Sequence, residues 1–149
     1  MVTLGRLRWW DIEAVLPLER EVFDGDVWTA HHFWSELGQM ATRHYLVARE
    51  GDRVVGYAGL CAYPDEAFVQ TMAVAADHRG QGLGALMLEG LLAEAERRGL
   101  RTVLLEVRAD NPQAQRLYER HGFRRTAVRR GYYPGGVDAW VMTRGPSLG

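Results

Sequence analysis

The chain has 149 residues, a length typical of one domain with a single hydrophobic core. Hydrophobic residues make up 47% and charged residues 25%, values that exclude a disordered or fibrous chain. Eighteen basic and nineteen acidic residues leave a formal net charge of −1, which argues against direct nucleic-acid binding because that requires a broad cationic surface. We expect residues 1–144 to form one domain and residues 145–149 a flexible tail.

Compartment and metal content are indicated by features that the sequence lacks. The first residues hold no apolar core of signal-peptide length, and no segment approaches the roughly 18 apolar residues that span a bilayer. The single cysteine, Cys61, lies among apolar residues, which favours a buried strand thiol over a reactive one. The five histidines show no ligand spacing. We therefore expect a cytoplasmic protein without membrane attachment and without a bound metal.

The first predicted helix follows Asp11, which is placed to act as its cap. Pro17 is expected to kink this helix, because proline removes a backbone hydrogen bond. The residues that share its apolar face are Ile12, Val15, Leu16, Val22 and Phe23.

A second helix is predicted after Thr29, its expected cap. Trp28 before this cap and Phe33 four residues after it have the spacing of a hydrophobic staple, so a structural role for Trp28 is one interpretation. Trp34 and Leu37 are expected to pack as well.

Three strand-like runs come next, and the turn residues between them favour an antiparallel meander. The runs are Tyr45–Arg49, Val54–Ala62 and Ala67–Val74. The apolar pattern then takes a helical period from Leu83 to Ala95, and the basic turn and glycine of Arg97–Gly99 end this helix.

The last part of the chain predicts strands and a helix in alternation. A buried strand is expected over Thr102–Val107, and Asn111-Pro112 has the pattern of a cap followed by a proline in the first helical position. Gly122 closes that helix. The remaining strands are expected at Phe123–Arg129 and Asp138–Thr143.

The glycine-rich segment Arg79–Gly84 lies between a predicted strand and the strongest predicted helix. Its three alternating glycines allow the backbone to approach an anion closely, and the helix start supplies unpaired N–H groups. A phosphate or pyrophosphate is the expected occupant, although a glycine-rich turn that merely packs is the alternative.

Two other phosphate-binding motifs compete for this segment. A nucleotide P-loop is excluded because Gly84 is followed by Ala85-Leu86 instead of Lys-Ser/Thr. A dinucleotide fingerprint is closer, since Glu106 lies about twenty residues further on at a strand end. The glycine spacing differs from that fingerprint, however, and only about forty residues follow Glu106.

The same segment resembles the acetyl-CoA signature Q/R-x-x-G-x-G/A of the GNAT acyltransferase superfamily, with Arg79, Gly82 and Gly84 at the required positions. In that superfamily the backbone amides of the signature hold the pyrophosphate of acetyl-CoA, and the preceding strand binds the pantetheine arm. The resemblance therefore implies cofactor binding by Met72, Ala73, Val74, Arg79, Gly80, Gln81, Gly82, Leu83 and Gly84.

Two later blocks narrow the resemblance. Leu105–Phe123 and the stretch Arg130-Gly131-Tyr132-Tyr133-Pro134 with Asp138-Ala139 are similar to the ribosomal-protein-alanine N-acetyltransferase (RimI) family. Asp65-Glu66-Ala67 matches the turn of that family before the signature strand. Together the similar blocks cover roughly residues 45–143. The resemblance implies an α+β GNAT fold, with a mostly antiparallel sheet of about seven strands flanked by about four helices.

Two residues have the properties that amide formation from a thioester requires, namely a base for the amine proton and an acid for the leaving thiolate. Glu106 is a carboxylate in an otherwise apolar strand, and a buried carboxylate needs a partner or a function. A salt bridge with Arg108 is its structural alternative. Tyr118 lies where the RimI family carries the acid that protonates coenzyme A, and a core aromatic beside Leu117 is the alternative for this residue.

The other candidate residues have equally good local explanations. By the resemblance Asn111 binds the cofactor, while a helix cap is its local alternative. Adjacent tyrosines in an extended segment point to opposite faces, so Tyr132 and Tyr133 are expected on the acceptor side, with loop packing as the alternative. Glu66 and Trp28 complete the candidate acceptor site, although Glu66 also fits a solvated turn.

These features lead to three hypotheses. The first is acetyl transfer from acetyl-CoA to the amino-terminal alanine of a ribosomal protein, by a monomer or weak homodimer. The second is a GNAT enzyme that acts on a small amine or a lysine side chain. The third is a non-catalytic acyl-CoA-binding module.

Overall fold

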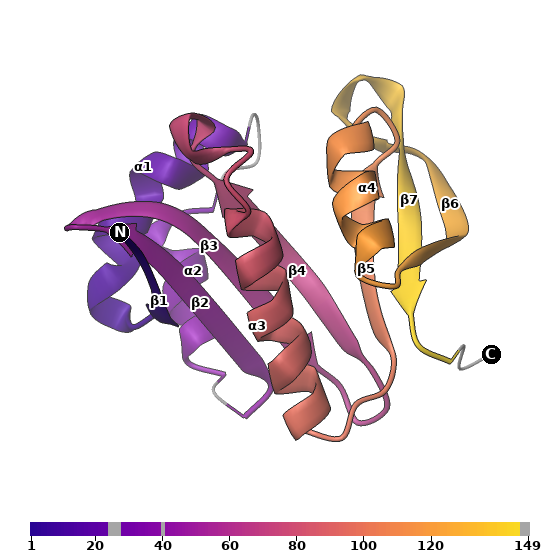
Figure 1. Ribbon diagram of the computed structural model, residues 1–149, viewed down its shortest axis with the longest axis horizontal. Helices are drawn as coiled ribbons and strands as arrows, with labels where there is room; N and C mark the ends of the chain where they lie inside the picture. The colour runs from indigo at the N-terminus through magenta and orange to yellow at the C-terminus, as the bar shows by residue number, and fades with distance from the viewer. Residues whose placement is uncertain (24–27, 40, 147–149) are drawn as a thin grey trace.

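The computed structural model describes residues 1–23, 28–39 and 41–146, which form one mixed sheet with helices on both faces (Figure 1). The strands are β1 (Val2–Arg6), β2 (Arg43–Glu50), β3 (Arg53–Ala62), β4 (Ala67–Val74), β5 (Val103–Arg108), β6 (Arg124–Tyr133) and β7 (Val137–Arg144). The helices longer than one turn are α1 (Ile12–Val22), α2 (Ala30–Leu37), α3 (Leu83–Arg97) and α4 (Pro112–Arg120). The expected fold class is confirmed.

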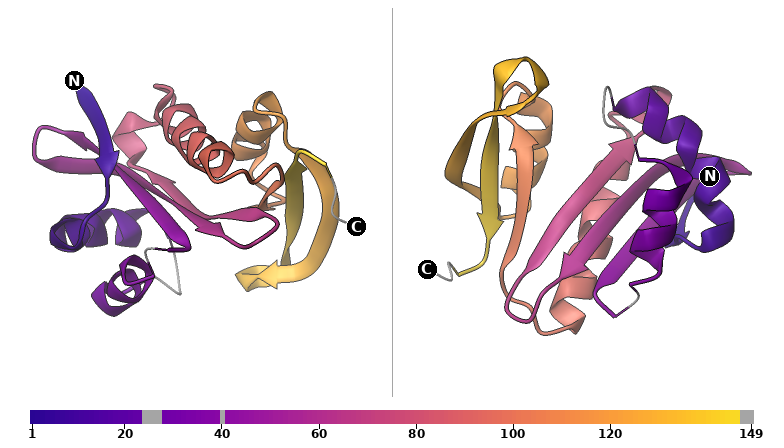
Figure 2. Two further views of the ribbon diagram at one scale, coloured as in Figure 1. Left: turned by 90° about the horizontal axis from the view of Figure 1, so that it is seen from below. Right: turned by 180° about the vertical axis from the view of Figure 1, so that it is seen from behind.

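The strands run in the order β1-β2-β3-β4-β5-β7-β6, and every neighbouring pair is antiparallel except β4 and β5. Helices α3 and α4 lie on one face of this sheet, while α1 and α2 lie on the other (Figure 2, left). The predicted meander of three strands is present as β2, β3 and β4. Strand β1 was not predicted, because its five residues form a short edge that gains its hydrogen bonds only from β2.

The parallel pair at the centre of the sheet is short. Strands β4 and β5 pair only from Ala67–Val103 to Val69–Leu105 and then diverge toward their carboxyl ends (Figure 1). In the same region the pairing of β4 with β3 shifts at Gly59 and Leu60, which leaves Gln70 as an unmatched bulge residue. The second half of β4 therefore has no strand on its β5 side.

Strand β5 has two unlike faces. Val103, Leu105 and Val107 are buried, whereas the residues between them are only partly buried. Helix α4 covers β5 on the same face as α3 (Figure 2), so the buried set points toward the helices. Glu106 consequently points to the opposite face, which α1 and α2 leave uncovered in this half of the sheet.

One expectation for the amino-terminal helices is wrong, and the expected packing of Trp34 is only partial. The Asp11 side chain does not cap α1; it accepts a hydrogen bond from the Arg8 N–H at 2.8 Å and forms an ion pair with Arg49. Arg49 lies on a strand far along the sequence, so local sequence patterns did not identify it as the partner of Asp11. Trp34 is 51% exposed and stacks on Trp9 with ring centroids 5.8 Å apart.

Other local predictions are confirmed. Thr29 caps α2, because its side chain accepts a hydrogen bond from the His32 N–H, and the Trp28 ring packs edge-on against Phe33 at 5.1 Å. Cys61 is a buried thiol in β3.

Within the predicted tail, the carbonyls of Gly145 and Pro146 accept hydrogen bonds, and residues 147–149 lie outside the described residues.

The buried Glu19 of α1 gives the fold a testable pH dependence. Its carboxylate accepts hydrogen bonds from the Tyr57 hydroxyl and from the Trp28 N–H, and burial raises the pKa of Glu19 above 4.5. The unfolded chain therefore releases this proton first, so the contribution of Glu19 to stability falls as pH rises from about 4.5 through the folded pKa. As pH rises through this range, we expect the free energy of unfolding of Glu19→Gln to increase relative to that of the wild type.

Urea unfolding at several pH values between 4 and 8 measures this difference. Glu13→Gln, an exposed change on the same helix, is the matched control and should show no such trend. A difference between Glu19→Gln and the wild type that stays constant with pH would contradict the assignment.

Candidate active site

The glycine-rich segment forms the start of α3. Gly80 and Gly82 have φ angles of 78° and 80°, in the left-handed region that glycine adopts without strain. Gly82 is the N-cap and has no side chain to accept the first N–H groups of the helix, and the first turn carries no acidic residue. These N–H groups and the positive end of the helix dipole suit an anion.

Gly84 lies where α3 meets α4. A Cβ atom added at Gly84 would lie 3.3 Å from Cδ2 of Leu117, so this glycine allows α3 to pack closely against α4. The Arg79 side chain is exposed, and its Nε donates to the Val74 carbonyl at 3.4 Å. Gln81 donates from Nε2 to the Asp77 carbonyl, also at 3.4 Å.

The segment Met72–Val74 lies beside this anion site, in the half of β4 that has diverged from β5 (Figure 1). The backbone groups of this half that point away from β3 face the gap between the two strands. A strand edge without a neighbouring strand suits an extended amide-containing chain, and of its backbone groups the Val74 carbonyl accepts from Arg79. The pantetheine arm that the sequence resemblance implies is such a chain.

Glu106 lies on β5, one residue beyond its last pair with β4. Its side chain is 26% exposed, less buried than its apolar neighbours in the sequence indicate, because alternation turns it to the uncovered face. Its Oε2 accepts a hydrogen bond from Nη1 of Arg129 on β6 at 2.8 Å. From the sequence, a salt bridge between Glu106 and Arg108 is the purely structural alternative. Arg108 instead forms an ion pair with Asp110 at 2.9 Å.

Tyr118 is buried on α4, with its ring edge-on to Phe123 at 5.9 Å. Burial, with a smaller effect of Tyr133, raises the pKa of Tyr118 to about 12. The Tyr118 hydroxyl has no hydrogen-bond partner within residues 1–23, 28–39 and 41–146. In the same residues, every side-chain nitrogen or oxygen that is inaccessible to solvent has a hydrogen-bond partner. The ring is therefore enclosed while the hydroxyl reaches solvent-accessible space.

Tyr133 is half-buried at the end of β6, and its pKa is raised first by burial and then by the Glu106 carboxylate. The Arg108 guanidinium lies over its ring, 5.2 Å from the centre. Tyr132 is 49% exposed, but the two rings do not point to opposite faces; they meet edge-on at 5.1 Å because β6 is irregular between Arg129 and Tyr133.

The remaining candidates lie elsewhere. Asn111 caps α4, since its Oδ1 accepts from the Ala114 N–H at 3.2 Å. Glu66 lies at the start of β4, where β4 and β5 still pair, at the opposite end of the strand from Arg79–Gly84. Trp28 packs against the hydrophobic core cluster, and its backbone N–H donates to Glu19 of α1. Glu106, Tyr118 and Tyr133 all come from the part of the chain after α3, on β5, α4 and β6.

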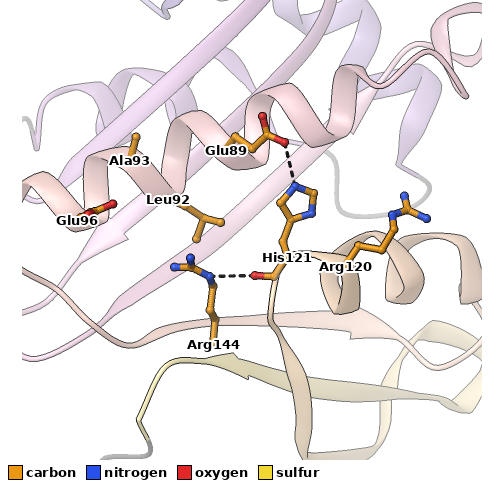
Figure 3. A pocket seen from close by; sticks show the side chains of 7 residues that line it. All are labelled: Glu89, Leu92, Ala93, Glu96, Arg120, His121 and Arg144. Atoms are coloured by element: carbon orange, nitrogen blue, oxygen red, sulfur yellow. Dashed lines mark hydrogen bonds and ion pairs between the residues drawn. The ribbon is translucent and has the colours of Figure 1, made fainter.

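A shallow hollow of about 380 Å³ lies between α3, α4 and the end of β7 (Figure 3). Its lining residues are Glu89, Leu92, Ala93, Glu96, Arg120, His121 and Arg144. His121 contacts Glu89 at 3.0 Å, and Arg144 donates to the His121 carbonyl at 2.9 Å. None of these lining residues belongs to the site predicted from the sequence, so the hollow and the site are separate.

The described residues lack two kinds of feature. Residues 1–23, 28–39 and 41–146 contain no group of three or more His, Cys, Asp or Glu side chains arranged to hold a metal ion. No helix in that part of the chain has the length and apolarity to cross a membrane.

Comparison with known proteins connects this geometry to a family. The pattern of the Acetyltransferase (GNAT) family matches residues 9–123. The chain is 40% identical over 149 residues to N-alpha-acetyltransferase RimI of Mycobacterium tuberculosis, covering 96% of this chain and 92% of that protein. An uncharacterised protein of Mycobacterium leprae is also 40% identical, and the chain spans only 40% of its length.

A solved structure agrees with the sequence comparison. The crystal structure of the ribosomal-protein-S18-alanine N-acetyltransferase from Escherichia coli has a TM-score of 0.88 and 34% identity, over 100% of this chain and 96% of that one. The family match spans more than half of the chain, and both relatives named as N-acetyltransferases match nearly end to end. The chain therefore belongs to the GNAT family of acetyltransferases.

Proposed function

We propose that this protein transfers the acetyl group of acetyl-CoA to the amino-terminal α-amine of a protein, and that its acceptor is the amino-terminal alanine of ribosomal protein S18. The observation that carries the proposal is the placement of Glu106 and Tyr118. Glu106 lies on β5 next to the point where β4 and β5 diverge, and Tyr118 lies on α4, which packs against the start of α3 that suits the donor. The names of the matched relatives support the choice of acceptor.

The chain would bind acetyl-CoA through three features. The N–H groups at the start of α3 and the exposed Arg79 hold the pyrophosphate. The open side of Met72–Val74 pairs with the amides of the pantetheine arm. Asn111 at the start of α4 contacts the same donor from the other side of the gap, in addition to capping its helix.

Glu106 acts as the general base. The ammonium form of an α-amine has no lone pair with which to attack a thioester. The acceptor therefore attacks as the neutral amine, and Glu106, directly or through water, removes the second proton as the amide forms. At pH 7 roughly a tenth of an α-amine is neutral, compared with about one in two thousand lysine side chains.

Tyr118 assists departure of the thiolate. Because its pKa is raised to about 12, Tyr118 keeps its proton at neutral pH. Complete transfer of this proton to a thiolate with an ordinary pKa near 8.5 is opposed by roughly 5 kcal/mol. Tyr118 therefore stabilises the leaving sulfur mainly as a hydrogen-bond donor, and the proton that finally resides on sulfur comes from solvent.

A direct assay tests this proposal. The purified protein is incubated with acetyl-CoA and a peptide that starts with the first residues of S18, next to its pre-acetylated twin and a set of polyamines. Mass spectrometry should locate one acetyl group on the α-nitrogen of the free peptide and none on its twin. Acetylation of polyamines alone, or of lysine side chains alone, would overturn the proposed acceptor.

A further inference from the structure

Arg129 reaches Glu106 across a neighbouring strand. In the sheet, Arg108 of β5 pairs with Ala139 of β7, which pairs with Arg129 of β6. These three residues share a face with Glu106, which lies two residues before Arg108. Because Ala139 has only a methyl group, the Arg129 side chain can pass over β7 and bring its Nη1 within 2.8 Å of Glu106 Oε2.

The ion pair between Arg129 and Glu106 can open readily. The side chains of Arg129 and Glu106 are 53% and 26% exposed, on a face that no helix of the described chain covers. An ion pair with this exposure contributes little to stability. The Arg129 guanidinium also lies 4.4 Å from the centre of the Tyr132 ring, a contact that it makes at the same time as the ion pair.

The pair controls what can approach the carboxylate. An ammonium ion would be drawn to an isolated Glu106, where it would form an ion pair that cannot attack a thioester. With Arg129 in place, that ammonium ion meets a positive charge that already occupies Oε2. A neutral amine has no such repulsion, and it can donate a hydrogen bond to the remaining oxygen.

We propose that Arg129 is a specificity-determining residue, which admits neutral amines to Glu106 and disfavours ammonium ions. This proposal rests on the proposed function, because it assigns Glu106 the role of base. Its consequence is weaker competition at Glu106 by the ammonium form, which is the larger fraction of every amine acceptor at physiological pH.

The first test measures binding of a permanent cation that cannot react. A peptide with an amino-terminal trimethylated alanine is used as a competitive inhibitor against the Ala-initiated substrate, at low ionic strength. We expect Arg129→Gln to tighten inhibition about five- to tenfold, because the charge repulsion is lost. Arg129→Lys should restore the weaker inhibition, and 0.5 M salt should reduce the difference.

Arg130→Gln is the matched control, because it removes the same charge from the next residue, which is also exposed. It should leave inhibition unchanged. Unchanged inhibition in Arg129→Gln, with thermal unfolding showing a folded protein, would overturn the proposal while acetylation of the Ala peptide continues. Absence of acetylation by the wild-type protein would instead overturn the proposed function.

Discussion

Replacement of Glu106 by glutamine is expected to lower kcat/KM for an Ala-initiated peptide by about 10²- to 10⁴-fold, the range associated with loss of a general base. Glutamine has nearly the same shape and can still accept a hydrogen bond from Arg129, but it cannot take up a proton. Most of the loss should appear in kcat. Affinity for coenzyme A should not change, since Glu106 lies on the face of the sheet opposite α3 and α4.

Steady-state kinetics and calorimetric titration with coenzyme A check these two expectations separately. Glu119→Gln, an exposed change next to Tyr118 on α4, controls for the loss of one negative charge. Turnover of Glu106→Gln within about twofold of the wild type would show that another group accepts the proton. Parallel losses in turnover and in coenzyme A affinity would point to a structural role for Glu106 instead.

Replacement of Gly82 by aspartate is expected to weaken coenzyme A binding about ten- to hundredfold relative to replacement by asparagine. Both side chains tolerate the left-handed conformation better than other residues, and a Cβ atom at Gly82 meets no atom within 4 Å. The two variants therefore share the same backbone cost and differ in one charge. That charge would lie beside the pyrophosphate, where repulsion of about 1–4 kcal/mol is expected at about 4 Å.

Titration of both variants with coenzyme A at low and high salt tests this expectation, because salt should reduce the difference between them. Gly99 provides the control, since it has a φ angle of 76° and open space at the other end of α3. Gly99→Asp and Gly99→Asn should bind coenzyme A equally. Equal binding by the two Gly82 variants would mean that the anion does not lie at this helix start.

Local sequence patterns predicted most of the secondary structure because their causes are local. Asn111 followed by a proline places the start of α4, and Thr29 caps α2 through an N–H only three residues away. The cap predicted for Asp11 was wrong because a distant residue, Arg49, competes for its carboxylate. A pattern of neighbouring residues predicts a side-chain contact correctly only when no residue distant in the sequence binds that side chain instead.

Arg79–Gly84 could be identified from the sequence alone, because a left-handed turn before a helix requires glycine and the exposed helix N–H groups follow directly from it. The sequence also singled out Glu106 and Tyr118 as candidates. Only the tertiary structure decided their surroundings. Divergence of β4 from β5 opens the gap beside Glu106, and the pairing of β6 with β7 brings Arg129 onto its carboxylate from 23 residues away. Strand pairing depends on contacts between distant segments, which a pattern of neighbouring residues does not specify.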